Sequence, residues 1–184
     1  MSSLFEEIKE RAVPYIINTL FDAVFTVMGI VIGSSFSARL DLKAIIGTII
    51  TASLSLGVSS GFSVYEAETL QEEKRIDEIE EALLEDLDGT VIAEKSRRVT
   101  LFSSTLVFIT PLLAGVATLV PFLLVYLGTI SVQMGVRIAI GVDLSLIFFT
   151  GYVFAVENRL MKGLRMMVLG IGVFLVGYLV NNIM

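Results

Sequence analysis

Apolar runs of bilayer-crossing length follow one another along this chain of 184 residues, and they constrain its fold more than any other feature. A helix needs about 20 apolar residues to cross the hydrocarbon core. Inside that core every backbone amide must be satisfied within the protein, which leaves helices or a closed barrel. A membrane barrel would show alternating segments of about ten residues, and the sequence shows none. We therefore expect an all-α integral membrane protein.

The apolar runs predict five transmembrane helices, interrupted once by a long polar segment. The stretch between that segment and the last polar loop is too long for one helix and right for two, with a boundary near 126–133 that stays open. The predicted ranges are a surface helix at 1–12, the first two transmembrane helices at 13–65, an acidic cytosolic helical segment at 66–98 and the last three transmembrane helices at 99–184.

The polar segment from Glu66 to Arg98 contains twelve acidic and five basic residues. Its apolar residues recur at three- and four-residue steps, which predicts an amphipathic helix. Two interpretations stay open: a solvated connector, or a site that collects cations for a path through the membrane. For the second, the candidate metal ligands are Glu78, Glu81 and Glu85, because carboxylates three or four residues apart share a helix face and repel one another when no cation is bound.

The composition excludes several classes of function. The chain has no cysteine and no histidine, so disulfides, zinc fingers and Ser-His-Asp catalysis are ruled out. A metal site would have to use carboxylate, carbonyl, hydroxyl or thioether ligands, which favours divalent cations such as Fe²⁺, Mn²⁺, Ca²⁺ or Mg²⁺. No basic patch points to nucleic acid. We expect neither an enzyme nor an organic cofactor.

The first apolar run contains Asp22 about nine residues from its start, at a depth of about 13 Å. Asn18, Thr26, Gly29 and Gly33 fall on the same side of the predicted helix. A carboxylate at that depth is costly and should face the protein interior or a wet cavity. Asp22 is then either part of an ion or proton path, or a structural carboxylate bonded to Asn18, Thr26 or a partner helix.

The second run has a stripe of small residues that includes Ser53, Gly57, Ser60 and Gly61. Such a stripe is typical of close helix packing, and it could equally form a polar wall opposite Asp22. Another aspartate, Asp143, lies further along the chain and is either buried and functional or close to a membrane interface.

The order of these parts resembles the vacuolar iron transporter family. Members of that family have five spans, an aspartate in the first, and a small, serine-rich second span that leads into an acidic cytosolic helical region. The residues that carry the resemblance are YIINTLFDAVFTVMGIVIG at 15–33, ASLSLGVSSGFSVYEAE at 52–68 and the glutamates that follow.

The resemblance implies a homodimer that exports Fe²⁺ or Mn²⁺ from the cytosol in exchange for protons, along a path between the first transmembrane helices of the two subunits. Asp22 matches the family's membrane aspartate and would bind the ion. The other residues expected to line the path are Asn18, Thr26, Ser55, Ser59 and Ser60. Where the family's second span has a methionine and a glutamate, this chain has Leu56 and Ser60. Those departures favour an alternative, a non-transporting membrane scaffold or sensor whose acidic cytosolic helix binds a metal or a protein partner.

Positive charges set the expected orientation. Five spans with the N-terminus in the cytosol place ten Lys and Arg residues on the cytosolic side and three on the other. We therefore expect the N-terminus and the acidic segment in the cytosol and the C-terminus outside. The short loops and the lack of cysteine favour a prokaryotic plasma membrane.

Overall fold

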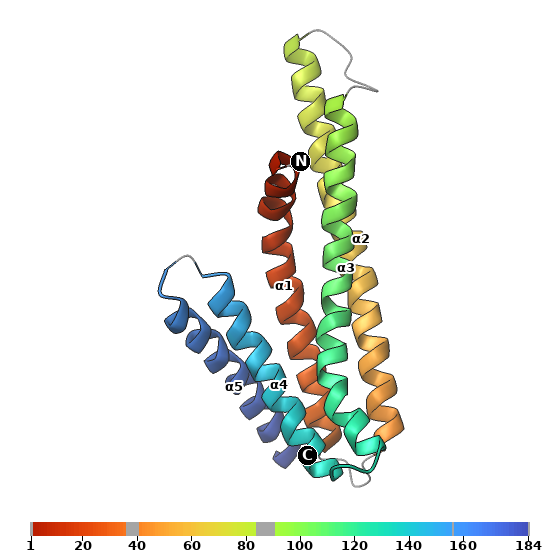
Figure 1. Ribbon diagram of the computed structural model, residues 1–184, viewed down its shortest axis with the longest axis vertical. Helices are drawn as coiled ribbons and strands as arrows, with labels where there is room; N and C mark the ends of the chain where they lie inside the picture. Colours follow the sequence, from red (N-terminus) through yellow and green to blue (C-terminus); the bar gives the residue numbers. More distant parts are fainter. Residues whose placement is uncertain (1, 36–40, 84–90, 156, 184) are drawn as a thin grey trace.

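The computed structural model describes residues 2–35, 41–83, 91–155 and 157–183, and the regular elements within them are all helices (Figure 1). In chain order these are α1 Ser2–Ser35, α2 Leu42–Leu83, α3 Val91–Tyr126, α4 Val132–Val153 and α5 Arg159–Ile183. Each of the five contains a stretch long and apolar enough to cross a membrane. The prediction of an all-α chain with five such helices is therefore confirmed.

Two of the helices are much longer than a bilayer requires. α2 has 42 residues and α3 has 36, which correspond to about 63 and 54 Å against a hydrocarbon core of about 30 Å. The two run side by side past the start of α1 and carry the described part of the acidic segment (Figure 1). α1 is also continuous from Ser2, so the helix expected at 1–12 is its first part.

Local sequence explains where these helices begin and end. Asp41 starts α2, because its Oδ1 accepts hydrogen bonds from the backbone N–H groups of Lys43 and Ala44 at 2.9 and 3.2 Å. α3 ends just before Gly128, whose φ of +72° lies in the left-handed region that glycine adopts without strain. Ser131 then caps α4 by accepting a hydrogen bond from Met134 N–H at 3.3 Å. These residues place the boundary that the sequence left open.

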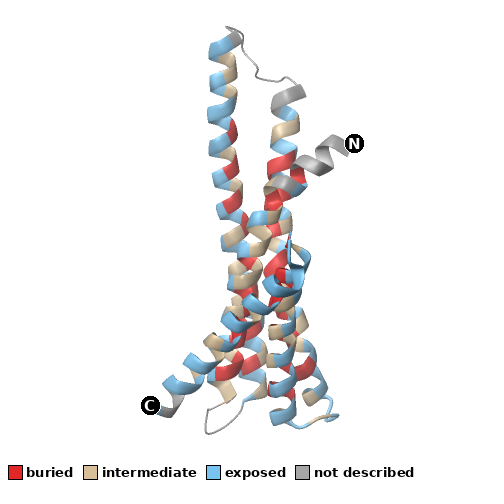
Figure 2. Ribbon diagram, turned by 90° about the vertical axis from the view of Figure 1, so that its left-hand side faces the viewer, coloured by how far each residue is buried: buried red, intermediate tan, exposed pale blue. Residues whose placement is uncertain are grey.

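α1 is the central helix of the bundle and packs against all four others. Its buried face joins two apolar clusters: one contains Val27, Val31, Ile49, Phe122 and Ala139, and the other contains Ala23, Val24, Ala114 and Ile147. Buried residues gather where the helices meet, whereas α5 and the projecting end of α2 are largely exposed (Figure 2). The bundle therefore leaves one side of α1 uncovered.

Candidate functional site

A polar groove of about 290 Å³ lies between α1 and α2 and contains Asp22. We call it the Asp22 groove. Its lining combines one carboxylate with hydroxyl and amide groups and two apolar side chains. The residues that line it are Tyr15, Asn18, Thr19 and Asp22 on α1, and Ser59, Ser60, Ser63, Val64 and Ala67 on α2. Four of the residues predicted for a transport path, Asn18, Asp22, Ser59 and Ser60, are thus brought together.

Asp22 is exposed in the groove rather than sealed in the protein core. Asn18 Nδ2 donates a hydrogen bond to Asp22 Oδ2 at 3.3 Å. Thr26 Oγ1 donates at 2.6 Å to the backbone carbonyl of Asp22, not to its carboxylate, and Thr26 is not among the groove residues. The carboxylate is therefore oriented by Asn18 and open to the groove, where a cation or a proton could reach it.

The small residues of α2 divide between two faces of the helix. Gly57 and Gly61 pack against α3 so closely that an added Cβ would lie 2.7 Å from the Phe108 carbonyl oxygen and 2.8 Å from Phe108 Cβ, respectively. Ser53 is buried on the same side, close to Gly115 of α3. The helix packing and the polar wall that the sequence left as alternatives are thus both present, on different faces of α2. Ser55 is exposed and does not line the groove.

The acidic residues predicted as metal ligands lie far from Asp22. Glu78 and Glu81 are exposed on the projecting part of α2, and Glu78 is about 27 Å along that helix from Ser60 in the groove. Glu85 lies outside the described residues. Among the residues that the structure describes, no group of three or more Asp or Glu side chains could hold a metal ion.

A buried ion-pair cluster joins α1 to α2 next to the groove, and sequence reasoning missed it. Arg11 Nη1 donates to Glu68 Oε2 at 3.3 Å and to Glu72 Oε1. Only 3% of Glu68 and 8% of Glu72 is exposed, and Tyr15 hydrogen-bonds to Glu68. The four-residue spacing of the two glutamates was visible in the sequence. Nothing in the sequence paired them with Arg11, which lies 57 positions before Glu68 and 61 before Glu72.

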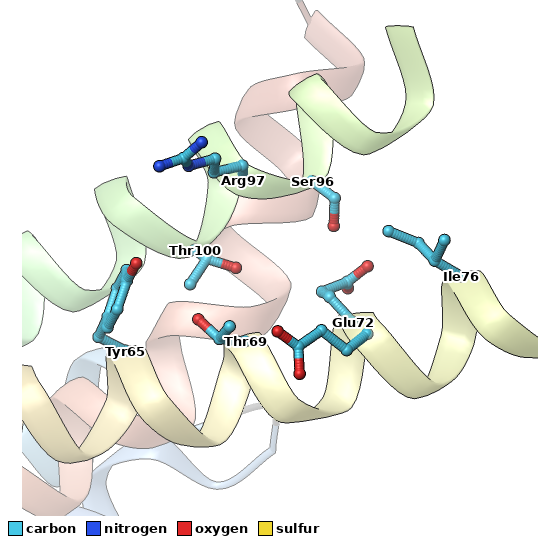
Figure 3. Close-up of a pocket in the computed structure, with 8 residues that line it drawn as sticks. Tyr65, Thr69, Glu72, Ile76, Ser96, Arg97 and Thr100 are labelled. Atoms are coloured by element: carbon cyan, nitrogen blue, oxygen red, sulfur yellow. The ribbon is translucent and has the colours of Figure 1, made fainter. Parts of the chain in front are cut away.

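On the opposite side of α2, a second pocket of about 330 Å³ lies between α2 and α3, and Figure 3 shows it in close-up. It is lined by Tyr65, Thr69, Glu72, Glu73 and Ile76 of α2 and by Ser96, Arg97 and Thr100 of α3. The buried hydroxyls of Ser96 and Thr100 have no hydrogen-bond partner. Because Glu72 lines this pocket and also pairs with Arg11, the ion-pair cluster lies between the pocket and the Asp22 groove.

The most deeply buried charged residue among those described is Asp143 on α4, which has no exposed surface. Thr118 of α3 hydrogen-bonds to its Oδ1, while its Oδ2 has no partner. Of the two positions that the sequence left open for Asp143, buried or near an interface, the structure shows the buried one. Arg137, six residues earlier on the same helix, is exposed.

The chain is 24% identical over 179 residues to a protein of Methanocaldococcus jannaschii that is described as uncharacterized, a match that covers 94% of this chain and 90% of that protein. No protein-family profile and no solved structure matches the chain. The description of the relative names no activity, so the function has to be argued from the groove and from the charged residues around it.

Proposed function

We propose that the protein is a membrane transporter that moves a divalent cation, Fe²⁺ or Mn²⁺, out of the cytosol in exchange for protons. The observation that carries this proposal is the Asp22 groove, where one carboxylate meets the side chains of three serines, Ser59, Ser60 and Ser63, amid helices apolar enough to cross a membrane. Oxygen donors of this kind suit hard divalent cations. A carboxylate at membrane depth is costly unless it serves a wet path or a partner.

The proposal includes a homodimer formed through α1. The stripe of α1 residues predicted from the sequence is exposed along its whole length, at Asn18, Asp22, Thr26, Gly29 and Gly33. An added Cβ on either glycine would meet no atom within 4 Å. A second copy packed on this stripe would shield Asp22 from lipid, as small-residue stripes do in membrane helix pairs, and would bring a second Asp22 to the same path.

The acidic projection of α2 acts in this proposal through its electric field rather than as a closed metal site. Glu78 and Glu81 are exposed, so they raise the local cation concentration at the entrance without enclosing an ion. The placement of this projection and of the N-terminus in the cytosol rests on the distribution of positive charges, and the choice of a prokaryotic plasma membrane rests on the short loops and the lack of cysteine. The proposal also draws on the resemblance of the sequence to the vacuolar iron transporter family, which suggests the ion and the exchange for protons.

The test is Mn²⁺ flux into liposomes that contain the purified protein and carry a pH gradient. Asp22→Asn keeps the shape of the side chain and removes its charge, so we expect flux to fall to the rate of protein-free liposomes. Glu157→Gln, an exposed change outside both the groove and the α2 projection, is the matched control and should keep most of the wild-type rate. Size-exclusion chromatography checks that both variants assemble like the wild type. Undiminished flux in Asp22→Asn would refute the assignment of the path.

The scaffold or sensor is the alternative outcome of this experiment. It predicts no flux of Fe²⁺, Mn²⁺ or Ca²⁺ through the wild-type protein. It also predicts that divalent cations leave the melting temperature unchanged, whereas a stabilisation that Glu78→Gln combined with Glu81→Gln abolishes would favour a metal site.

A further inference from the structure

Asp143 is sealed between the two apolar clusters of the bundle. One helical turn to either side of it on α4, Ala139 and Ile147 are 0% and 1% exposed and belong to different clusters. Across from it on α3, Thr118 lies in the same way between Ala114 and Phe122. The carboxyl group therefore faces apolar side chains on both sides along the helix, and Thr118 is its one polar partner among the described residues.

In the described helix segments that pack around Asp143, no positive charge compensates it. Between positions 12 and 35 of α1, Asp22 is the single Asp, Glu, Lys or Arg, and α3 has none from 99 to 126. α5 has none from 166 to 183, and on α4 itself Arg137 is exposed. Tyr126, Tyr152 and Tyr178 lie in the last two turns of their helices, whereas Tyr15 lies in the N-terminal half of α1 and hydrogen-bonds to Glu68. An ionised carboxylate here would lack both water and a counter-ion, which is among the costliest arrangements in a protein.

The hydrogen bonds around Thr118 also fit a carboxyl group that holds a proton. Thr118 Oγ1 lies within hydrogen-bonding distance of two oxygens, Asp143 Oδ1 and the Ala114 carbonyl at 3.2 Å. A hydroxyl has one hydrogen to donate, so it cannot serve both oxygens if Asp143 is ionised. If Asp143 carries the hydrogen on Oδ1, it donates to Thr118, which donates to Ala114, and both contacts are satisfied.

We propose that Asp143 is a proton-binding site in the membrane interior, and that the proton it holds is the one exchanged for the cation at Asp22. The second part rests on the transport function proposed above. In the exchange, the O–H bond of the carboxylic acid breaks, the proton leaves to water, and the carboxylate left behind is compensated by the charge of the incoming cation. Protonation from the other side restores the acid when the cation leaves.

The two aspartates are suitably placed for such an exchange. Val24 packs in the same cluster as Ile147 of α4, and Asp22 lies two residues before it, about 3 Å along the axis of α1. Asp22 therefore lies close, along α1, to the part of that helix that packs in the cluster of Ile147, which is one helical turn from Asp143 on α4, and it lies on the exposed side of α1. Because charges act over longer distances where water is excluded, a cation at Asp22 would favour ionisation of Asp143 without touching it.

Infrared spectroscopy of the purified protein in lipid bilayers tests the proton site directly. At pH 7 we expect a C=O stretch from a protonated carboxylic acid that is lost in Asp143→Asn and retained in Asp22→Asn. Thr118→Val should keep the band and shift its frequency, because it removes the hydrogen bond to the carboxyl group. Melting temperatures verify that each variant is folded. A wild-type spectrum without the band, or a folded Asp143→Asn variant that keeps it, would overturn the proposal.

Addition of Mn²⁺ tests the coupling. We expect the band to weaken and protons to appear in a weakly buffered solution, with both responses absent in Asp143→Asn. A band that does not respond to Mn²⁺ in protein that transports Mn²⁺ would refute the exchange. If the wild-type protein transports no cation, the transport proposal fails, whereas the infrared band still decides whether Asp143 holds a proton.

Discussion

Asp22 and Asp143 are both carboxylates within membrane-length helices, but their surroundings give them different chemistry. Asp22 is exposed in a groove and is hydrogen-bonded by Asn18, so it can exchange ligands with solvent. Asp143 has no exposed surface and, among the described residues, one hydrogen-bond partner, Thr118, which suits the proton proposed as its ligand. The proposed ion site and the proposed proton site are separated in this way and could be occupied alternately.

Arg11 illustrates how much a single residue can stabilise the fold when it compensates buried charges. Replacement by Met would leave the buried Glu68 without its guanidinium partner, and would leave Glu72 with only the longer 3.7 Å contact to Arg75. Removing one member of a buried ion pair costs about 3–5 kcal/mol, and the 20% exposure of the Arg11 side chain should bring the loss toward the lower end. Arg11→Met should therefore clearly lower the melting temperature in detergent.

The control for this prediction is Arg98→Met. Arg98 pairs with Glu94 at 2.6 Å on an exposed face of α3, where the two side chains are 70% and 65% accessible, so the expected change is below about 0.5 kcal/mol. Adding Glu68→Gln to Arg11→Met should recover part of the lost stability. Equal melting temperatures for Arg11→Met and Arg98→Met would show that the buried cluster does not stabilise the fold.

The residues of α2 show what the sequence could predict at this scale. The stripe of small residues was visible in the sequence, because serine and glycine recur from Ser53 to Gly61. Which of them pack and which line a groove depends on the positions of α1 and α3 around α2, and one sequence does not contain that information. The groove is completed by Ser63, Thr19 and Tyr15. These residues continue the three- and four-residue spacing of the predicted site residues, so the same spacing rule could have predicted them.

At the scale of elements, α1 has one face in the core and one face without a partner. The uncovered face holds Asp22, Thr26, Gly29 and Gly33. Next to it, a groove of about 450 Å³ between α1 and α5 is lined by Gly29, Gly33 and Gly177, with Ile32, Val173, Val176 and Val180. A carboxylate and bare glycines are poor surfaces to present to lipid. A helix from another subunit would cover both.

The lack of cysteine in the chain makes this arrangement testable by cross-linking. A single Thr26→Cys or Gly33→Cys should form a disulfide-linked dimer on mild oxidation in the membrane, because a symmetric contact brings the same position of two subunits together. Val116→Cys, at a position of α3 that is 59% exposed, is the control and should remain monomeric. Cross-linking at Val116 but at neither α1 position would place the interface elsewhere.

The helices themselves were largely predictable, because the length of an apolar run fixes a transmembrane segment with little help from tertiary contacts. The third and fourth were harder to separate, since the apolar stretch continues through Pro111 and Pro121, both of which lie inside α3. The break comes at Gly128 and Ser131, where a left-handed glycine and a side-chain cap stop one helix and start the next. The pairing of Asp143 with Thr118 could not be predicted, because it depends on the register between α3 and α4.

At the scale of the whole molecule, the α1 start and the projecting ends of α2 and α3 lie at one pole, and the C-terminus lies at the other (Figure 1). This is the arrangement that five antiparallel crossings require, but it does not say which pole is cytosolic. The charge distribution supplies a prediction, because ten of the thirteen Lys and Arg residues fall in the first part of α1, in the acidic segment carried by α2 and α3, and in the first part of α5. The positive-inside rule predicts that the pole of the N-terminus and the acidic projection is cytosolic.

Single cysteines at the two poles test this orientation in intact cells that express the protein. Thr129→Cys, in the exposed connection between α3 and α4, should react with a maleimide that cannot cross membranes. Lys74→Cys, exposed on the projection of α2, should react only after the cells are permeabilised. The opposite pattern would place the acidic projection outside, where its field would collect cations for entry rather than export. The direction of the proposed transport therefore depends on the side of the membrane from which Lys74 can be reached.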